Sequence, residues 1–411
     1  MATLFITCRW PDPLATFTYG TALRMRMFLR ALHALGDPID LLLFRPQDVP
    51  EDPSAPERIA DEMRARWALP VRSVTVAPRQ PRRPQATGLF GRYVLPAAGI
   101  GRQSAYAEMA GPSQRAAVEA AIVASVPQRI FIHRLNAMVP LLAMPRPAVP
   151  VFFDLDDIEH RAFARSIKEP PHWRSKPLQR LQLPALVRAE RQAAALAART
   201  FVCSDADRVY LSERLRNNRI AVVPNALPVP APAPPCAAPT VLFIGVYLYE
   251  PNRQAAERLA HRVWPWVRAR CPGARLLLAG RHAELVHGHG APPPGVQFLG
   301  FVADLDDLYA GVRVVACPIQ SGAGTRVKII EAALYGRPVV STTLGAEGLQ
   351  FDPARGEIVI ADGDEAMAAE IVRLLGDPAR AQAVGAAARS RALAAYSESA
   401  AIETALRNFR T

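Results

Sequence analysis

Short apolar runs rich in branched residues alternate with helical patterns along the whole chain, and this alternation most constrains the fold. The chain opens with strand-like runs at 4–8 and 39–44, separated by a helical pattern over 21–36 that ends at a glycine. Later strand-like runs in this half lie at 129–133, 149–157, 199–205 and 220–225, with a long helical pattern at 184–199. Strands separated by helices predict a parallel, doubly wound α/β sheet.

A second alternation of the same kind begins near residue 240. Its expected strands lie at 240–245, 274–280, 296–301, 312–319, 337–342 and 357–360, and its expected helices at 252–270, 304–310 and 326–336. Alanine-rich helical patterns then continue to the end of the chain. The repeat predicts two Rossmann-like domains facing a central cleft, in which ligands bind at the carboxyl ends of the strands.

A proline-dense stretch separates the two halves. Proline lacks an amide hydrogen and excludes helix and central strand, so this stretch favours an extended linker. We predict an N-terminal domain over 1–228, a linker over 229–239 and a C-terminal domain over 240–395. Residues 396–411 form a last helical segment, a candidate for packing back on the N-terminal domain.

Composition narrows the classes of function. With 49 Lys and Arg against 37 Asp and Glu, the net charge of +12 favours anionic partners. The basic residues are scattered without the aromatic interleaving of RNA-binding surfaces, so nucleic acid is not an expected partner. The five cysteines include no CxxC pair, which favours a cytoplasmic protein over a disulfide or zinc framework. No run approaches the roughly 20 apolar residues of a membrane span, so any membrane contact is expected to be peripheral.

The segment 317–349 places a glycine-containing turn directly before a helix. Glycines let the backbone approach a ligand, and the amides of a helix N-terminus bind phosphate. Arg326 and Lys328 add positive charge for a diphosphate, and the carboxylate of Glu331 suits a ribose diol. The competing interpretation is a tight turn followed by an i,i+3 surface pair. The turn itself comprises Ser321, Gly322, Ala323, Gly324 and Thr325, with Thr325 as the expected N-cap.

This segment resembles the donor-binding signature of glycosyltransferase family 4, which are retaining enzymes of GT-B fold. The relevant subgroup reads G-x-G-T-R-x-K-x-x-E-A followed by G-x-P-V-V. The matching residues here are Gly322, Gly324, Thr325, Arg326, Lys328, Glu331, Ala332, Gly336, Pro338, Val339 and Val340. The resemblance extends from about residue 200 to the end. The resemblance also places five residues in the family's other donor-contacting segments: Gly245, Asn252, Arg281, Phe301 and Val302.

The resemblance implies a retaining, metal-independent transferase of hexosyltransferase type that needs no cofactor. It would move a sugar from a nucleotide-diphosphate sugar to a hydroxyl of a glycan or lipid-linked acceptor, in surface polysaccharide or glycoconjugate synthesis. In this picture Glu331 binds the ribose, the 322–325 turn with Arg326 and Lys328 binds the diphosphate, and Phe301 with Val302 contacts the base. The family's usual first glutamate, eight residues before Glu331, is replaced by Ala323. The alternatives are a non-catalytic scaffold subunit that binds nucleotide sugars, and a nucleotide-sugar epimerase of GT-B fold.

The N-terminal half contributes candidate residues at the ends of its strands. Gly20 and Arg24 follow the first strand, His133 ends another, and Asp154 lies in a strand that runs into further acids. These four are candidate cleft or acceptor contacts, and a helix start or solvated side chains are the competing interpretations. The acids show no glycine-punctuated calcium loop, so we expect no metal site. The four residues predicted to be catalytic are Arg326, Lys328, Asp156 and His160.

Residues 161–191 are rich in Arg and Lys and contain Phe163 and Trp173. An anionic membrane surface is therefore a candidate partner, peripheral on the cytoplasmic face of the inner membrane. A solvated insertion is the alternative interpretation.

Overall fold

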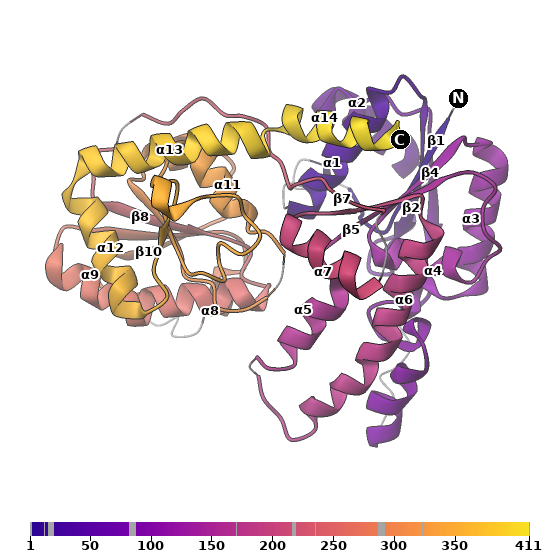
Figure 1. Ribbon diagram of the computed structural model, residues 1–411, viewed down its shortest axis with the longest axis horizontal. Coiled ribbons are helices and arrows are strands. Elements are labelled where there is room, and N and C mark those ends of the chain that lie inside the picture. The colour runs from indigo at the N-terminus through magenta and orange to yellow at the C-terminus, as the bar shows by residue number, and fades with distance from the viewer. Residues whose placement is uncertain are drawn as a thin grey trace. The chain divides into compact units, whose positions relative to one another are not determined.

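The computed structural model describes residues 2–11, 13–14, 20–81, 88–169, 171–215, 219–234, 236–286, 292–322 and 324–410 (Figure 1). The chain forms two compact units. Unit 1 comprises Met1–Asn225 with Ala401–Thr411, and unit 2 comprises Ala226–Ala400. The predicted end of the N-terminal domain, 228, and the predicted start of the last helical segment, 396, lie within a few residues of the boundaries between the two units.

Unit 1 is built on a seven-stranded parallel sheet with the order β3-β2-β1-β4-β5-β6-β7. Its strands are β1 (Thr3–Thr7), β2 (Ile39–Arg45), β3 (Ser73–Pro78), β4 (Arg129–His133), β5 (Val151–Asp156), β6 (Arg199–Val202) and β7 (Ile220–Val222). Six of these strands were expected, and β3 was not. It is an edge strand whose side chains are mostly exposed or half-buried, so it lacks the continuous apolar run that marks a buried parallel strand.

The helices of unit 1 cover both faces of this sheet. They are α1 (Gly20–His33), α2 (Ala55–Trp67), α3 (Pro112–Ser125), α4 (Leu135–Leu142), α5 (Glu159–Ser166), α6 (Leu183–Leu196), α7 (Asp205–Leu215) and α14 (Glu398–Phe409). Among the described helices, none is long and apolar enough to cross a membrane.

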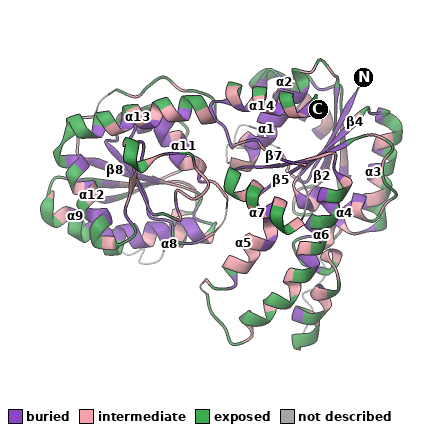
Figure 2. Cartoon of the chain, in the orientation of Figure 1, coloured by how far each residue is buried: buried purple, intermediate pink, exposed green. Residues whose placement is uncertain are grey.

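Strand side chains alternate between two helical layers, because successive residues of a strand point to opposite faces. Leu4 and Ile6 of β1 belong to a core shared with α3, α4 and α6. Phe5 points to the other face and stacks on Phe131 of β4, with ring centroids 5.0 Å apart. The central strands of both units are accordingly buried, as Figure 2 shows, whereas the edge strands β3 and β10 are partly exposed.

The C-terminal helix α14 packs on the face of the sheet that carries the aromatic rings. Phe409 lies 5.1 Å from the ring of Phe152, 5.5 Å from that of Phe201 and 6.0 Å from that of Phe131. Phe28 of α1 lies against the same rings. The last helix therefore packs on unit 1.

Unit 2 is a six-stranded parallel sheet with the order β10-β9-β8-β11-β12-β13. Its strands are β8 (Thr240–Ile244), β9 (Arg275–Ala279), β10 (Val296–Gly300), β11 (Val314–Cys317), β12 (Val339–Ser341) and β13 (Val359–Ile360). Its helices are α8 (Glu250–Arg258), α9 (Trp264–Arg270), α10 (Leu305–Ala310), α11 (Val327–Leu334), α12 (Asp364–Gly376) and α13 (Pro378–Tyr396). All six strands were expected from the sequence.

The proline-rich stretch runs extended along unit 2 and is held there by arginines. Arg313 donates to the carbonyls of Cys236 and Ala237, Arg337 donates to Pro234, and Arg389 donates to Pro230 at 3.0 Å. Prolines offer carbonyl acceptors but no amide donors, so a segment of this kind depends on side-chain donors. The predicted linker is thus bonded along its length to the second unit.

Phe409→Ala should destabilise unit 1. The side chain is only 6% exposed, and removing a buried phenylalanine typically costs about 3–5 kcal/mol. Chemical denaturation should show this loss in the free energy of unfolding, whereas Glu403→Ala, on the exposed side of the same helix, should leave it nearly unchanged. Equal stability of the two variants would contradict the packing of α14.

Candidate functional site

The order of strands in unit 2 creates a ligand-binding position beside β8. From β8 the chain first adds β9 and β10 on one side and then crosses to β11 on the other. The helices that follow β8 and β11, α8 and α11, therefore lie on opposite faces of the sheet (Figure 1). Open α/β sheets bind ligands at the carboxyl ends of their strands at such a switch point.

Three predicted residues meet at this position. The Lys328 ammonium of α11 donates to the Asn252 side-chain oxygen of α8 at 2.7 Å, and lies 4.1 Å from the centre of the Phe243 ring. Gly245 follows β8, and a Cβ there would lie 2.8 Å from both of these polar side chains, so a larger residue would displace them. Burial lowers the pKa of Lys328 from its ordinary value of 10.5 to about 8. An anion beside this ammonium would raise its pKa again, because it stabilises the charged form.

The turn between β11 and α11 is braced by its own arginine. Arg326 donates to the carbonyl of Gly324 and, at 3.1 Å, to that of Ser321. The helix begins at Val327 with Arg326 at the N-cap, so Thr325 is not the N-cap and that prediction was wrong by one position. Gly322 has φ of +89° and approaches Tyr249 closely, which only glycine permits. Ala323 lies outside the described residues.

Glu331 lies on the next turn of α11 and is oriented by a buried tyrosine. The Tyr309 hydroxyl of α10 donates to a Glu331 carboxylate oxygen at 2.7 Å, and the Tyr309 ring stacks on Tyr335. Burial raises the pKa of Glu331, while the Tyr309 hydroxyl and the Lys328 charge act in the opposite direction. The carboxylate is thus held by a fixed donor in a desolvated environment.

An aromatic and a guanidinium lie together at the ends of β9 and β10. The Arg281 guanidinium lies 4.5 Å from the centre of the Phe301 ring, which is 50% exposed. Val302, the next residue, is half-buried. A planar cation on an exposed ring forms a flat surface suited to stacking. The structure therefore pairs Arg281 with Phe301, the predicted base contact.

Sequence reasoning missed several residues of this region. Tyr309 orients Glu331, and Gln254 of α8 accepts a hydrogen bond from the Ser321 hydroxyl at 3.2 Å. Phe243 supplies the ring beneath Lys328. Tyr309 and Phe243 lie within apolar patterns that predict only core residues, so spacing along the chain carried no signal for these roles.

The predicted residues of unit 1 gather at the carboxyl ends of β1, β4 and β5. Arg24 of α1 donates three hydrogen bonds to the Asp154 carboxylate at 2.6–3.0 Å, and one to the Val223 carbonyl at 2.7 Å. Burial raises the pKa of Asp154 to about 6, yet these charge-assisted bonds keep it ionised at neutral pH. Burial acts to lower the pKa of Arg24, and Asp154 raises it above its ordinary value. Both side chains are fully buried, so neither presents a charge to a ligand.

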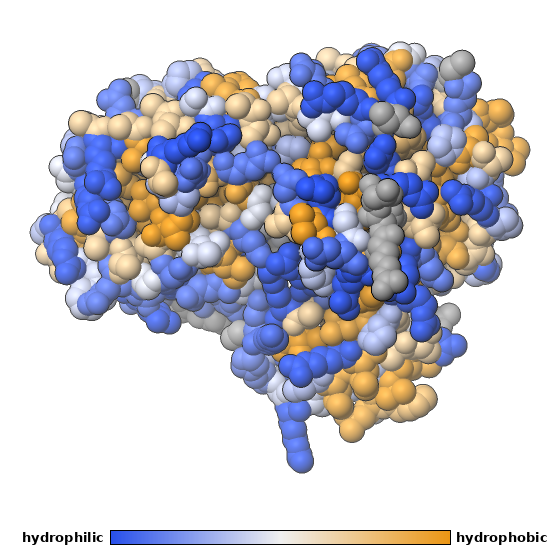
Figure 3. Space-filling model, in the orientation of Figure 1, coloured by the Kyte–Doolittle hydropathy of each residue, from blue (hydrophilic) through white to orange (hydrophobic). Residues whose placement is uncertain are grey.

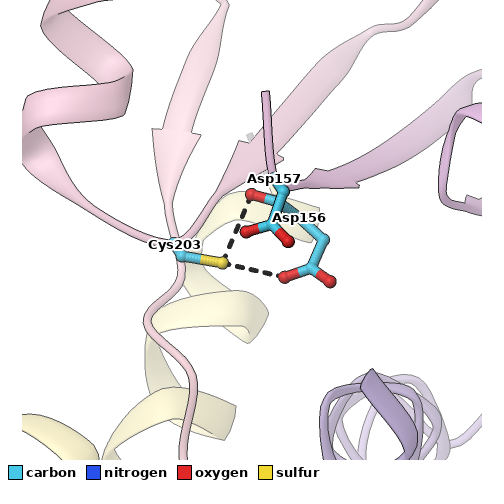
Figure 4. Close-up of side chains that lie close together, drawn as sticks. All are labelled: Asp156, Asp157 and Cys203. Carbon is cyan, nitrogen blue, oxygen red and sulfur yellow. Dashed lines mark hydrogen bonds between the residues drawn. The ribbon is translucent and has the colours of Figure 1, made fainter. Parts of the chain in front are cut away.

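Asp156 is held by two cations and a thiol. Arg134 donates to its carboxylate at 2.7 Å, the Arg24 guanidinium lies 3.5 Å away, and the Cys203 thiol donates at 3.0 Å (Figure 4). Burial opposes ionisation of Asp156, but Arg134 and Arg24 hold its pKa below the ordinary value. Arg134, with φ of +73° and ψ of 159°, adopts a backbone conformation that costs a non-glycine residue about 1–3 kcal/mol. Such strain marks this edge of the sheet as a position where side-chain direction is tightly fixed.

Asp156, Asp157 and Cys203 are the one group within the described residues whose ligand atoms lie close enough to hold a metal ion (Figure 4). Burial raises the pKa of the Cys203 thiol well above its ordinary value, so the sulfur is a hydrogen-bond donor. The cations beside Asp156 already balance its charge. The expectation of no metal site stays a prediction.

The remaining candidates of unit 1 are less accessible than the sequence suggested. His133 is fully buried, with one ring nitrogen 3.0 Å from the Thr7 hydroxyl, and burial lowers its pKa well below the ordinary value. His160 of α5 is bonded through one ring nitrogen to Glu190 and through the other to the Tyr210 hydroxyl at 2.8 Å. Gly20 is the first residue of α1. These contacts give both histidines structural partners, and their roles in binding or catalysis stay predictions.

Comparisons with known proteins agree with this arrangement. Residues 238–377, within unit 2, match the family model of glycosyl transferases group 1. No curated protein matches the sequence.

Solved structures extend the match to the whole chain. Sucrose-phosphate synthase from Thermosynechococcus elongatus is 17% identical, with a TM-score of 0.71 over 100% of this chain and 98% of that one. TarM of S. aureus is 11% identical, with a TM-score of 0.70 over 100% and 99%. Anabaena HepE, solved in complex with UDP-glucose, is 15% identical, with a TM-score of 0.64 over 100% and 99%. At these identities the likeness shows the fold, which is GT-B.

Asp154→Asn should strongly destabilise unit 1. The substitution removes the charge of the carboxylate that accepts three hydrogen bonds from the fully buried Arg24 guanidinium, and breaking a buried pair in this way typically costs about 3–5 kcal/mol. Asp205→Asn, which removes an exposed partner of Arg208, should cost at most about 1 kcal/mol. Chemical denaturation compares the two, and a small loss for Asp154→Asn would show that Arg24 is not held by this carboxylate.

Proposed function

We propose that this protein is a glycosyltransferase that binds a nucleotide-diphosphate sugar at the carboxyl edge of the unit 2 sheet. The arrangement of Lys328, Asn252 and Gly245 at the switch point carries the proposal. A desolvated ammonium suits a diphosphate, because an anion beside it stabilises the charged form that burial disfavours. The glycine next to this ammonium adds no side chain that would obstruct the anion. The match of residues 238–377 to glycosyl transferases group 1 supports the same assignment.

The rest of the nucleotide would lie along the same edge. The Glu331 carboxylate, fixed by Tyr309, would accept hydrogen bonds from the ribose diol. The Arg281–Phe301 pair would stack on the base. The turn at 321–325 would surround the diphosphate, with Arg326 bracing its carbonyls. HepE of the same fold is solved with UDP-glucose, which makes a uridine nucleotide the first donor to test.

The reaction proposed is transfer with retention at the anomeric carbon. The resemblance of residues 317–349 to retaining enzymes supports this stereochemistry. Lys328 would stabilise the leaving diphosphate without a metal ion or cofactor, since positive charge aimed at the developing charge is the main electrostatic requirement. Asp156 and His160 are proposed to contribute from the unit 1 sheet edge, held in place by Arg134 and Glu190.

The acceptor proposed is a hydroxyl of a glycan or lipid-linked glycan, in surface polysaccharide or glycoconjugate synthesis. The location proposed is the cytoplasm, with peripheral attachment to the inner membrane. The family resemblance supports the acceptor class, and the surface of unit 1 supports the attachment.

Glu331→Ala should weaken nucleotide-sugar binding by about 1–3 kcal/mol, which is roughly 5- to 150-fold in Kd. The cause is loss of the ribose hydrogen bonds, which leaves the diol unpaired. Calorimetric titration of the native chain and the variant with a panel of nucleotide sugars measures the effect and identifies the base. Glu365→Ala, an exposed glutamate of α12, is the matched control and should bind like the native chain.

Turnover separates the transferase from its alternatives. Release of free nucleoside diphosphate from the tightest-binding donor, with the acceptor present, is the expected result. Tight binding without turnover on any acceptor would support a non-catalytic subunit, and conversion of the donor to its epimer would support an epimerase. If no nucleotide sugar binds, or if Glu331→Ala binds as well as the native chain, the donor assignment is wrong.

Donor affinity should fall by about tenfold between pH 7 and pH 9. The Lys328 ammonium, with a pKa near 8 in the empty site, loses its proton over this range, and the diphosphate of a nucleotide sugar keeps a constant charge there. The affinity is nearly full at pH 7 and is lost as the pH rises through the pKa near 8. Lys328→Met should bind more weakly at pH 7 and show a flat profile, so an equal slope in this variant would assign the titration to another group.

A further inference from the structure

A helical lobe projects from unit 1, formed by two stretches far apart in sequence. The first, residues 88–103, follows β3, and the second, residues 161–182, leads from α5 toward α6. Within it, the Trp173 indole donates to the Tyr93 hydroxyl at 3.0 Å, and the same hydroxyl lies 2.8 Å from Ser175. Gln103 donates to the Gln182 carbonyl at 2.9 Å. These bonds fix the two stretches to one another as a single surface.

The outer surface of the lobe is apolar to an unusual degree. It carries six of the seventeen large apolar side chains that are exposed among the described residues: Leu89 (61%), Phe90 (69%), Val94 (44%), Trp173 (41%), Leu178 (39%) and Leu181 (46%). Figure 3 shows apolar side chains gathered on the lower part of this unit. Scattered exposed apolar residues are ordinary, but a contiguous group marks a surface that meets a partner.

The lobe is strongly basic. Its two stretches contain eight Lys and Arg and one acidic residue, Glu169. The exposed cations are Arg92, Arg102, Lys168, Arg174 and Arg180. Lys176 is buried against the Trp173 ring and donates to backbone carbonyls, so it serves the fold of the lobe.

We propose that the helical lobe docks on an anionic lipid bilayer. Exposed Leu, Phe and Trp side chains with cations around them match the acyl boundary and the headgroup region together. A protein partner would need an apolar groove surrounded by acidic groups. An anionic bilayer offers an apolar interior beneath negatively charged headgroups over its whole surface. The indole of Trp173 has an apolar ring and a polar edge, the chemistry enriched at membrane interfaces.

Docking would bring the bilayer close to the candidate acceptor side. Helix α5 begins at Glu159, three residues after Asp156, and leads directly into the second stretch of the lobe. If the proposed transferase activity holds, its acceptor is then an amphiphile presented at the membrane surface. The docking itself is independent of that activity, and binding to vesicles tests it separately.

Co-sedimentation with vesicles tests the proposal on the full-length chain. The protein should bind phosphatidylcholine vesicles containing phosphatidylglycerol, bind pure phosphatidylcholine vesicles much more weakly, and detach as salt rises because exposed charges are screened. Leu89→Ser with Phe90→Ser should reduce binding by roughly tenfold or more, because two apolar side chains no longer enter the interface. Arg174→Glu with Arg180→Glu should reduce binding to anionic vesicles by at least a similar factor.

The matched control is Val123→Ser with Val126→Ser. These valines are 76% and 78% exposed on α3 and the turn after it, which lead into the start of β4, the central strand of the sheet. The control should bind vesicles like the native chain, and thermal melts of all variants should coincide because every changed side chain is exposed.

Two outcomes would overturn the proposal. One is equal binding to neutral and anionic vesicles, or binding that the lobe variants leave unchanged. The other is a native dimer in light scattering that Leu89→Ser with Phe90→Ser converts to a monomer while vesicle binding stays the same, which would make the lobe an interface between copies of this chain.

Discussion

The candidate sites of both units depend on one constraint, the reversal of strand order beside a central parallel strand. In unit 2, β8 has β9 on one side and β11 on the other, so the helices that follow β8 and β11 leave the sheet on opposite faces. Side chains from two layers then converge without obstructing one another. Asn252 and Lys328 meet this way although 76 positions separate them in sequence. In unit 1 the same geometry at β1 and β4 places Arg24 near the ends of β4 and β5.

The two switch points use buried charge in opposite ways. In unit 1, the Arg24 guanidinium is saturated by a carboxylate and a backbone carbonyl, so its charge holds the sheet edge together. In unit 2, the Lys328 ammonium donates to a neutral amide oxygen, that of Asn252, and burial lowers its pKa. A charge balanced inside the fold resists removal, whereas a desolvated cation beside a neutral amide gains from an incoming anion. This contrast favours unit 2 over unit 1 as the place where the proposed diphosphate binds.

The sequence predicted the sheets, and which unit 2 candidates lie together, better than it predicted the contacts of the unit 1 candidates, for a physical reason. Glycines and charges at the ends of apolar runs mark strand ends, and these signals led to Lys328 and Glu331, whereas Gly245 came from the family resemblance. Whether a charge at a strand end faces solvent or a buried partner depends on contacts across the sheet, such as those of Asp154 with Arg24 and of His160 with Glu190. Spacing along the chain carries no information on these pairs. The edge strand β3 was missed because half-exposed side chains hide its apolar pattern.

The excess of arginine is explained by internal chemistry as much as by partners. The chain has 39 prolines, each of which offers a carbonyl without an amide donor. Arg313, Arg337 and Arg389 supply the missing donors along the extended stretch of unit 2. Arg326 does the same for the turn before α11. Guanidinium groups are suited to this task because one side chain carries five donors in a rigid plane. These arginines have partners within the fold, and the cations that point to a partner are those exposed on the helical lobe beside its apolar side chains.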